Sequence, residues 1–160
     1  MILYHGSLEM VSEPRILVPG RTLDYGAGFY TTTSEQQAEE WVKRKLDNGS
    51  SGFVNVYEFD EKAAAELDCL RFDNPPGENW VDFVHSNRTD RNFVHQYDLV
   101  YGPVANDRVY AAFALYEQGL LNKQELIAEL KTYSLIDQML FHTEKALAYI
   151  HFVEAKEVRR

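Results

Sequence analysis

The chain has 160 residues, of which 45% are hydrophobic and 26% charged, so it predicts one folded domain over residues 1–160 rather than a disordered segment. Its 16 Lys and Arg against 25 Asp and Glu give a net charge of −9, which argues against a broad electrostatic grip on nucleic acid. A single cysteine, Cys69, excludes a disulfide within the chain and a cysteine-based zinc site.

The sequence also indicates where the protein works. No apolar run approaches the roughly 20 residues of a membrane span, so we expect no membrane partner. The N-terminus lacks the basic and then apolar pattern of a signal peptide. Together with the lone cysteine, these features predict a cytoplasmic protein.

The first 31 residues predict two short strands joined through glycine-rich turns. Residues 2–5 are apolar and precede Gly6 and Ser7, so they predict a strand that delivers His5 to its end. A loop follows over residues 14–20. Residues 23–31 combine aromatic and β-branched residues with two glycines, which predicts a bend that leads into a second strand.

Regular elements follow along the rest of the chain. Ser34 and Gln37 have the spacing of a helix cap, and the apolar residues after them recur at helical intervals, which predicts a helix over residues 35–46. Strand formers dominate residues 53–59. The remaining predicted elements are a helix reaching about residue 88, a strand at 98–101, helices at 109–119 and from 122, a strand at 138–142, a short helix at 143–148 and a strand at 150–153.

The order of these elements constrains the fold class. Strands and helices alternate irregularly, and the strands are short. This pattern favours an α+β fold with a mixed or antiparallel sheet over a doubly wound parallel sheet.

Three separated motifs carry candidate chemistry. The first is Tyr4-His5-Gly6-Ser7, and the second is Gly26-Ala27-Gly28-Phe29-Tyr30, followed eleven residues later by Trp41. The third is Asp137-Gln138-Met139-Leu140-Phe141. In this order they resemble the ADP-ribosyltransferase superfamily, in particular its His-Tyr-Glu branch, which includes the poly(ADP-ribose) polymerases and diphtheria-type toxins.

A second resemblance covers nearly the whole chain. Residues 98–105 and 138–147, together with the overall layout, look like a bacterial family of unknown function that is placed in that superfamily. The resemblance implies a split, mostly antiparallel β core flanked by helices, with NAD as co-substrate between its two halves. It further implies relatives that act as toxins and are paired with a small antitoxin protein.

The resemblance assigns roles to the first two motifs. His5 would bind a ribose hydroxyl of NAD, and the main chain of Gly6 would meet the nicotinamide carboxamide. An imidazole can donate to or accept from a hydroxyl, and glycine lets main chain approach a ligand closely. Tyr30 would stack on the cationic nicotinamide ring. Ser7 and Gly28, the other members of these motifs, would lie at the same NAD site.

Two positions near the second motif depart from the polymerases. Trp41 stands where they carry a second stacking tyrosine, although its helical spacing equally suits packing in the core. Ala38 stands where they carry a serine for the carboxamide, so that hydrogen bond must be absent or come from elsewhere.

The third motif departs from the superfamily at the residue that matters most. Gln138 stands where the transferases usually have a glutamate, so it can hydrogen-bond a hydroxyl but supplies neither charge nor a base. Asp137, on the opposite face of a regular strand, and Glu144 are the alternative carboxylates. Asp107 would border the site only if it does not simply begin a helix.

The sequence therefore predicts a mono-ADP-ribosyltransferase with His5, Tyr30 and Gln138 as catalytic residues and an unknown acceptor. An NAD glycohydrolase remains open, and so does a catalytically silent module that binds NAD or ADP-ribose. The other histidines, His85, His95, His142 and His151, lack metal-ligand spacing, so we expect no metal.

Overall fold

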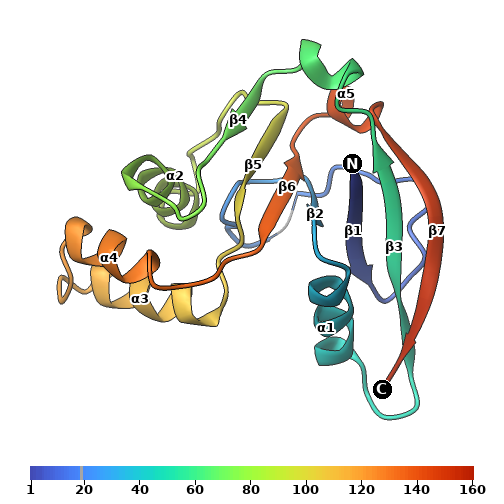
Figure 1. The fold of residues 1–160 in the computed structure, drawn as a ribbon, viewed down its shortest axis with the longest axis horizontal. Coiled ribbons are helices and arrows are strands. Elements are labelled where there is room, and N and C mark those ends of the chain that lie inside the picture. Colours follow the sequence, from blue (N-terminus) through green and yellow to red (C-terminus); the bar gives the residue numbers. More distant parts are fainter. Residues whose placement is uncertain (19) are drawn as a thin grey trace.

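The computed structural model describes residues 1–18 and 20–160; Pro19, which belongs to the loop predicted at 14–20, lies outside them. The described residues form seven strands, five α-helices and one short 3-10 helix (Figure 1). The strands are β1 Ile2–Ser7, β2 Phe29–Thr32, β3 Ser51–Phe59, β4 Cys69–Arg71, β5 Leu99–Pro103, β6 Asp137–Phe141 and β7 Ile150–Arg159. The helices are α1 Glu35–Lys45, η1 Ala63–Glu66, α2 Glu78–Thr89, α3 Asp107–Glu117, α4 Lys123–Leu130 and α5 Glu144–Leu147.

All seven strands belong to one sheet with the order β4-β5-β6-β2-β1-β3-β7. Only β4 and β5 run parallel, and every other neighbouring pair is antiparallel. The predicted α+β class with a mostly antiparallel sheet is confirmed. The contact between β1 and β2 consists of a single register pair, Tyr4 opposite Thr32, so the sheet is weakest at its centre.

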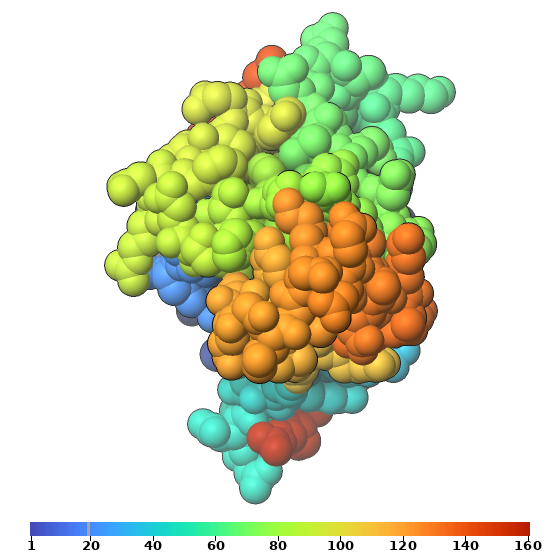
Figure 2. All heavy atoms as spheres, turned by 90° about the vertical axis from the view of Figure 1, so that its left-hand side faces the viewer, coloured from blue at the N-terminus to red at the C-terminus, as the bar shows by residue number. Residues whose placement is uncertain are grey.

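Two separate groups of helices cover one face of the sheet. Helices α2, α3 and α4 pack on β5 and β6 through a large apolar cluster that includes Val100 and Leu140. Helix α1 packs on the β3 and β7 side through a small cluster that includes Val42 and Val54. Figure 1 shows the two groups on either side of β2, and Figure 2 looks onto α3 and α4, in orange, with α1, in cyan, below them.

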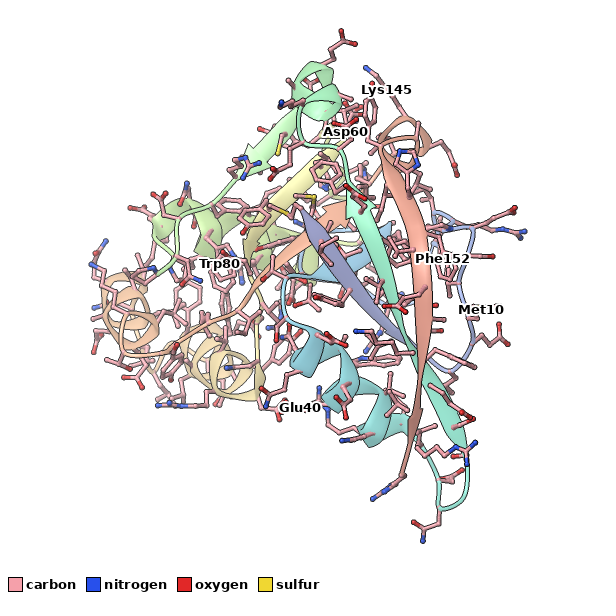
Figure 3. All side chains as sticks on the ribbon, turned by 45° about the vertical axis from the view of Figure 1, so that its right-hand side comes forward. Met10, Glu40, Asp60, Trp80, Lys145 and Phe152 are labelled. Atoms are coloured by element: carbon pink, nitrogen blue, oxygen red, sulfur yellow. The ribbon has the colours of Figure 1, made fainter. Side chains whose placement is uncertain are left out.

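The opposite face of the sheet carries a third cluster. Because side chains alternate along a strand, Leu3, Phe29 and Tyr57 point to this face, together with Met139 and Phe141. Figure 3 shows Trp80 among the helices of one half of the molecule, while Phe152 marks β7 at the far edge of the other half.

Local sequence signals explain most element boundaries. The Ser34 side chain accepts a hydrogen bond from the Gln37 N–H and so begins α1, as predicted. Asn122 and Glu125 form a reciprocal capping box at the start of α4. Asn106 caps α3, which places Asp107 in its first turn and confirms that this residue helps to begin the helix.

Several predicted boundaries are wrong. Strand β1 continues to Ser7, so His5 lies within it and not at its end. Strand β7 runs to Arg159 rather than to residue 153, because an edge strand tolerates the charged residues that follow Val153. Strand β4 has three residues and was not predicted, because so short a segment carries no periodic signal. Strand β5 includes Gly102 and Pro103, which were expected to stop it.

Candidate functional site

His5 lies where β1 and β2 separate. Its Nδ1 is 2.7 Å from the main-chain oxygen of Tyr30 on β2, and its ring stacks on Phe29 with centroids 4.4 Å apart. A carbonyl oxygen can only accept, so Nδ1 carries the proton and Nε2 carries the lone pair. Burial lowers the pKa of His5, which keeps the imidazole neutral at physiological pH.

The tautomer of His5 leaves one atom for a ligand. Within residues 1–18 and 20–160, Nε2 of His5 has no hydrogen-bond partner, and it is not among the fully buried atoms that lack one. A neutral Nε2 accepts a hydrogen bond and does not donate one. His5 is therefore suited to accept from a hydroxyl.

Gly6 has main-chain groups at the same opening. The Met1 and Phe59 main chains bond each other, so the odd-numbered residues of β1 bond to β3 and the Gly6 N–H faces β2. In a continued antiparallel ladder the Gly6 N–H would donate to the Tyr30 carbonyl. The register pairing of β1 with β2 ends at Tyr4, however, and the Tyr30 carbonyl accepts a hydrogen bond from His5 Nδ1. The His5 imidazole thus bonds the carbonyl that lies opposite Gly6, at the point where the pairing of β1 with β2 stops.

Helix α1 lies directly against Gly6. A Cβ atom at Gly6 would be 2.5 Å from the Ala38 carbonyl oxygen and 3.0 Å from Val42, so only glycine fits. The structure therefore brings together Gly6 and Ala38, as the resemblance implied. The methyl group of Ala38 offers no hydrogen bond to a ligand at this point.

Tyr30 has a structural role that the sequence did not reveal. Its hydroxyl donates to the Gly26 carbonyl at 2.6 Å and accepts from the Tyr25 N–H at 3.1 Å, so it ties the bend to the strand. Burial raises the pKa of the Tyr30 phenol, which therefore stays protonated. The side chain is only partly buried, and its ring packs at the border of the large cluster.

Gly28 allows the bend to approach β6. Its φ is +147°, and a Cβ atom there would lie 2.3 Å from the Phe141 carbonyl oxygen. A side chain at this position would push β2 away from β6. The pairing of these two strands fixes the position of Tyr30 relative to Gln138. The glycine pattern of the second motif thus has a steric cause within the protein itself.

Gln138 shares a sheet face with Tyr30. It lies opposite Thr32, two residues from Tyr30 on the same strand, and is 8% exposed. Its Nε2 donates to the Pro103 carbonyl at 3.4 Å. The Oε1 atom accepts no hydrogen bond from the described residues and so is the group of Gln138 that a ligand can use.

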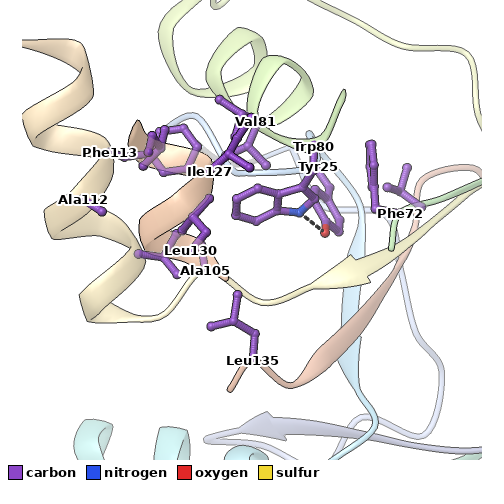
Figure 4. Packing of buried hydrophobic residues seen from close by; sticks show 14 of the residues in the cluster. Tyr25, Phe72, Trp80, Val81, Ala105, Ala112, Phe113, Ile127, Leu130 and Leu135 are labelled. Atoms are coloured by element: carbon purple, nitrogen blue, oxygen red, sulfur yellow. Dashed lines mark hydrogen bonds between the residues drawn. The ribbon is translucent and has the colours of Figure 1, made fainter. Parts of the chain in front are cut away.

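A buried polar chain supports Gln138 from below. The Tyr25 hydroxyl donates to the Pro103 carbonyl at 2.8 Å and accepts from Nε1 of Trp80 at 2.8 Å, as the dashed line in Figure 4 shows for the second bond. Both Tyr25 and Trp80 are fully buried. Because Pro103 offers only an acceptor, the amide nitrogen of Gln138 must face it and the amide oxygen must face away.

Trp41 does not pack in the core. It is 40% exposed on α1, while Ala38 and Val42 form the buried face of that helix, so the core interpretation is wrong. The Lys45 ammonium lies 5.7 Å from its ring centroid.

The Ser7 hydroxyl accepts from the Glu9 N–H at 3.2 Å and so stabilises the turn after β1.

The alternative carboxylates lie away from Tyr30. Asp137 points to the opposite face of β6, where it accepts hydrogen bonds from Asn74 and from the Tyr101 hydroxyl, each at 3.0 Å. Glu144 is exposed in the first turn of α5. Neither carboxylate shares the sheet face of Gln138 and Tyr30.

The sequence did not point to the histidines that hold the glycine bend. His95 donates to the Tyr25 carbonyl at 2.7 Å, and His142 donates to the Ala27 carbonyl at 2.6 Å. With the Tyr30 hydroxyl on Gly26, three consecutive carbonyls each accept a bond from a side chain, and two of these side chains are distant in the sequence. No sequence spacing announces these contacts, because 70 and 115 residues separate the partners.

Two searches of the described residues concern metals and membranes. No group of three or more His, Cys, Asp or Glu within residues 1–18 and 20–160 is arranged to hold a metal ion. Across the same ranges, none of the helices combines the length and apolar character that crossing a membrane requires.

Comparison with known proteins places the chain in a family. No curated protein and no solved structure matches it. Residues 1–152 match the family described as "Protein of unknown function (DUF3990)", which is nearly the whole chain. The chain therefore belongs to the DUF3990 family of proteins of unknown function.

Proposed function

We propose that this protein is an NAD-dependent mono-ADP-ribosyltransferase. The observation that carries the proposal is the end of the pairing between β1 and β2, where the His5 imidazole bonds the Tyr30 carbonyl beside Gly6. There an acceptor nitrogen, a main-chain donor and the Tyr30 ring come from two adjacent strands. The His5 ring lies on the Phe29 face of the sheet and the Tyr30 ring on the opposite face with Gln138, so a ligand that uses all three would pass between the strands. This combination suits a nicotinamide riboside, which offers hydroxyls, a carboxamide and a flat cationic ring.

Each group would make a definite contact with NAD. Nε2 of His5 would accept from a ribose hydroxyl, the Gly6 N–H would donate to the carboxamide oxygen, and the Tyr30 ring would stack on nicotinamide. Oε1 of Gln138, on the Tyr30 face, would accept from a hydroxyl of the other ribose. These contacts hold the sugar in place while its bond to nicotinamide lengthens.

The reaction balances without a metal or redox partner. The bond between ribose C1′ and the nicotinamide nitrogen breaks, and its electron pair leaves with the nicotinamide. A nucleophile of the acceptor then bonds to C1′ and loses its proton. The resemblance of the sequence motifs to those of the His-Tyr-Glu transferases and their toxins supports this assignment, and it also suggests a small antitoxin as a partner.

A second candidate is a silent module that binds NAD or ADP-ribose without turnover. A third is an NAD glycohydrolase with water as acceptor. Gln138 favours the silent module, because its amide cannot stabilise the positive charge that develops on the sugar. The buried polar chain below it holds the amide rather than a carboxylate.

Incubation with NAD labelled in its adenylate part tests the proposal. Nicotinamide release is followed together with transfer of the label, with purified protein alone and with cell extract. Label on a macromolecule supports transfer, nicotinamide release without label supports hydrolysis, and binding without turnover supports the silent module.

His5→Ala provides the matched variant, with His151→Ala as its control because His151 is exposed on β7. Loss of one hydrogen bond of about 1 kcal/mol would weaken NAD binding roughly fivefold in His5→Ala only. Unchanged NAD affinity in a folded His5→Ala protein would contradict the proposed site.

A further inference from the structure

A pocket of about 320 Å³ lies behind the glycine bend. Its walls come from the bend at residues 20–27, from residues 87–95 at the end of α2 and beyond, and from His142 after β6. His5, Tyr30 and Gln138 do not line it. The pocket therefore shares none of these three residues with the proposed NAD site, and its properties can be judged without that proposal.

Two stacked imidazoles form part of the pocket wall. The rings of His95 and His142 lie with centroids 3.9 Å apart. His95 is saturated, since its Nε2 donates to the Tyr25 carbonyl and its Nδ1 accepts from the Tyr97 N–H. His142 donates from Nδ1 to the Ala27 carbonyl, so its Nε2 carries a lone pair and accepts no bond from the described residues.

Asn87 supplies a second acceptor. It is 5% exposed, and its Nδ2 donates to the Phe83 carbonyl at 2.9 Å. That bond fixes the orientation of the amide and leaves Oδ1 near Gly26, without a hydrogen bond from the described residues. The inner wall thus offers two acceptors, which call for a ligand with an N–H or NH₂ donor.

The outer wall has a different character. Phe93 and Val94 give an apolar surface that is partly exposed, 37% and 66% respectively. Arg21 and Arg91 also line the pocket, against one carboxylate, Asp90. In a chain of net charge −9, a pocket with two arginines suits an anionic group, which arginine binds through paired N–H donors.

We propose that this pocket binds a nucleoside monophosphate whose base carries an exocyclic amine, with adenylate as the best match. The base amine donates to Asn87 and His142, the ring lies against Phe93, and the phosphate meets the two arginines. The volume lies within the range of small-molecule pockets, roughly 300–1,000 Å³. A free nucleotide and the adenylate half of a dinucleotide share this chemistry.

Calorimetric titration with AMP and with purine riboside monophosphate tests the proposal on the full chain. The second nucleotide has a hydrogen atom where AMP has the amine and, unlike IMP, has no ring N–H, so it offers no donor to the two acceptors of the wall. We expect AMP to bind with a stoichiometry of one and purine riboside monophosphate to bind at least about tenfold more weakly. Equal affinities, or no binding of AMP at millimolar concentration, would overturn the proposal.

Arg91→Ala tests the anion end, with Arg44→Ala as its control, because both arginines are exposed and Arg44 lies on α1. We expect a loss of AMP affinity of about five- to tenfold in Arg91→Ala alone, from a charge-assisted hydrogen bond. Identical affinities in the two variants would contradict the assignment of the phosphate.

Competition in His5→Ala identifies the source of the nucleotide. AMP should bind this variant as tightly as the wild type, since His5 does not line the pocket. Displacement of AMP by NAD assigns the pocket to the adenylate of a dinucleotide, and undisturbed AMP binding assigns it to a free nucleotide. Failure of NAD turnover leaves all these results intact, so the two proposals fail separately.

Discussion

Single side chains at the proposed site serve the fold and a ligand at the same time. His5 bonds the Tyr30 carbonyl of the neighbouring strand with one ring nitrogen and keeps the other as an acceptor. Tyr30 ties the bend with its hydroxyl, which leaves the ring as the group for stacking. Substitutions that remove only one of these functions can therefore distinguish binding from stability.

Tyr30→Phe keeps the ring and removes the hydroxyl. We expect it to lower the free energy of unfolding by about 1–3 kcal/mol, because the Gly26 carbonyl and the Tyr25 N–H lose their partner. NAD affinity should stay within about twofold of the wild type, whereas Tyr30→Leu should lose stacking worth about 1 kcal/mol. Urea denaturation and calorimetry measure the two quantities, and a Tyr30→Phe protein as weak in NAD binding as Tyr30→Leu would contradict the role of the ring.

Gln138→Glu tests whether charge limits turnover. The new carboxyl would be buried and would face the Pro103 carbonyl, so its pKa would rise above the ordinary value of about 4.3. We expect nicotinamide release to increase with pH as this group ionises, while the wild type shows no such step. The fold should lose stability over the same pH range, since the folded state favours the protonated carboxyl.

A pH-independent rate in a folded Gln138→Glu protein would show that charge at this position is not limiting. Gln138→Leu is the matched control, because it removes the amide acceptor without adding charge. Its rate should fall below that of the wild type at every pH.

At the scale of elements, the glycine bend is held by side chains from three places in the chain. Tyr30 follows it directly, His95 lies in the connection between α2 and β5, and His142 follows β6. The bend is therefore stabilised by contacts with the residue after β6 and with the connection after α2. The conformation of the second motif depends on contacts that no local pattern contains.

His95 makes this bend sensitive to pH. Burial lowers its pKa, and a second proton would have to enter at Nδ1, which accepts from the Tyr97 N–H, beside the His142 ring. Below the ordinary pKa of about 6.5 the unfolded chain binds more protons, so stability should fall as the pH drops toward the lowered pKa. Burial also lowers the pKa of His5, which adds to the loss of stability at acidic pH. Burial raises the pKa of Asp24, which opposes this loss of stability at still lower pH.

Comparison with His95→Gln isolates the contribution of this residue. Glutamine can donate to the Tyr25 carbonyl but does not titrate. Between pH 7.5 and 5.0 the free energy of unfolding of the His95→Gln protein should therefore fall less than that of the wild type, with a difference of up to about 1.4 kcal/mol per pH unit. Urea denaturation at each pH measures it, with exposed His151→Gln as the control. Parallel pH profiles for wild type and His95→Gln would contradict this explanation.

The sequence predicted the elements whose signals are local. Caps and apolar periodicity were sufficient for α1, α3 and α4, and the alternation of short strands gave the correct fold class. The relation of His5 to Tyr30 was available only as a motif, since it depends on the strand order β6-β2-β1. The position of Trp41 was left open between stacking on a ligand and packing in the core, because its helical spacing does not decide between them, and the structure excludes the core position.

At the scale of the whole molecule, the large cluster connects the helices to the proposed site. Trp80 on α2 donates to Tyr25, Tyr25 donates to Pro103 at the end of β5, and Gln138 on β6 donates to the same carbonyl. Such a chain of bonds within a buried core is costly when one member is left unpaired. The helical layer and the orientation of Gln138 should therefore be energetically coupled.

A double-mutant cycle between Trp80 and Tyr25 measures this coupling. Tyr25→Phe leaves the buried indole N–H and the Pro103 carbonyl with fewer partners, so it should lower the free energy of unfolding by about 1–3 kcal/mol. Trp80→Phe removes the indole donor and some packing. Because the N–H is already absent in Trp80→Phe, adding Tyr25→Phe should cost about 0.5–2 kcal/mol less than it does alone. Tyr149 packs against the cluster on the other face of the sheet, so the losses of unfolding free energy in Tyr149→Phe and Trp80→Phe should simply add. Equal coupling energies for both pairs would mean that the effect comes from general loosening of the core and not from the hydrogen bond.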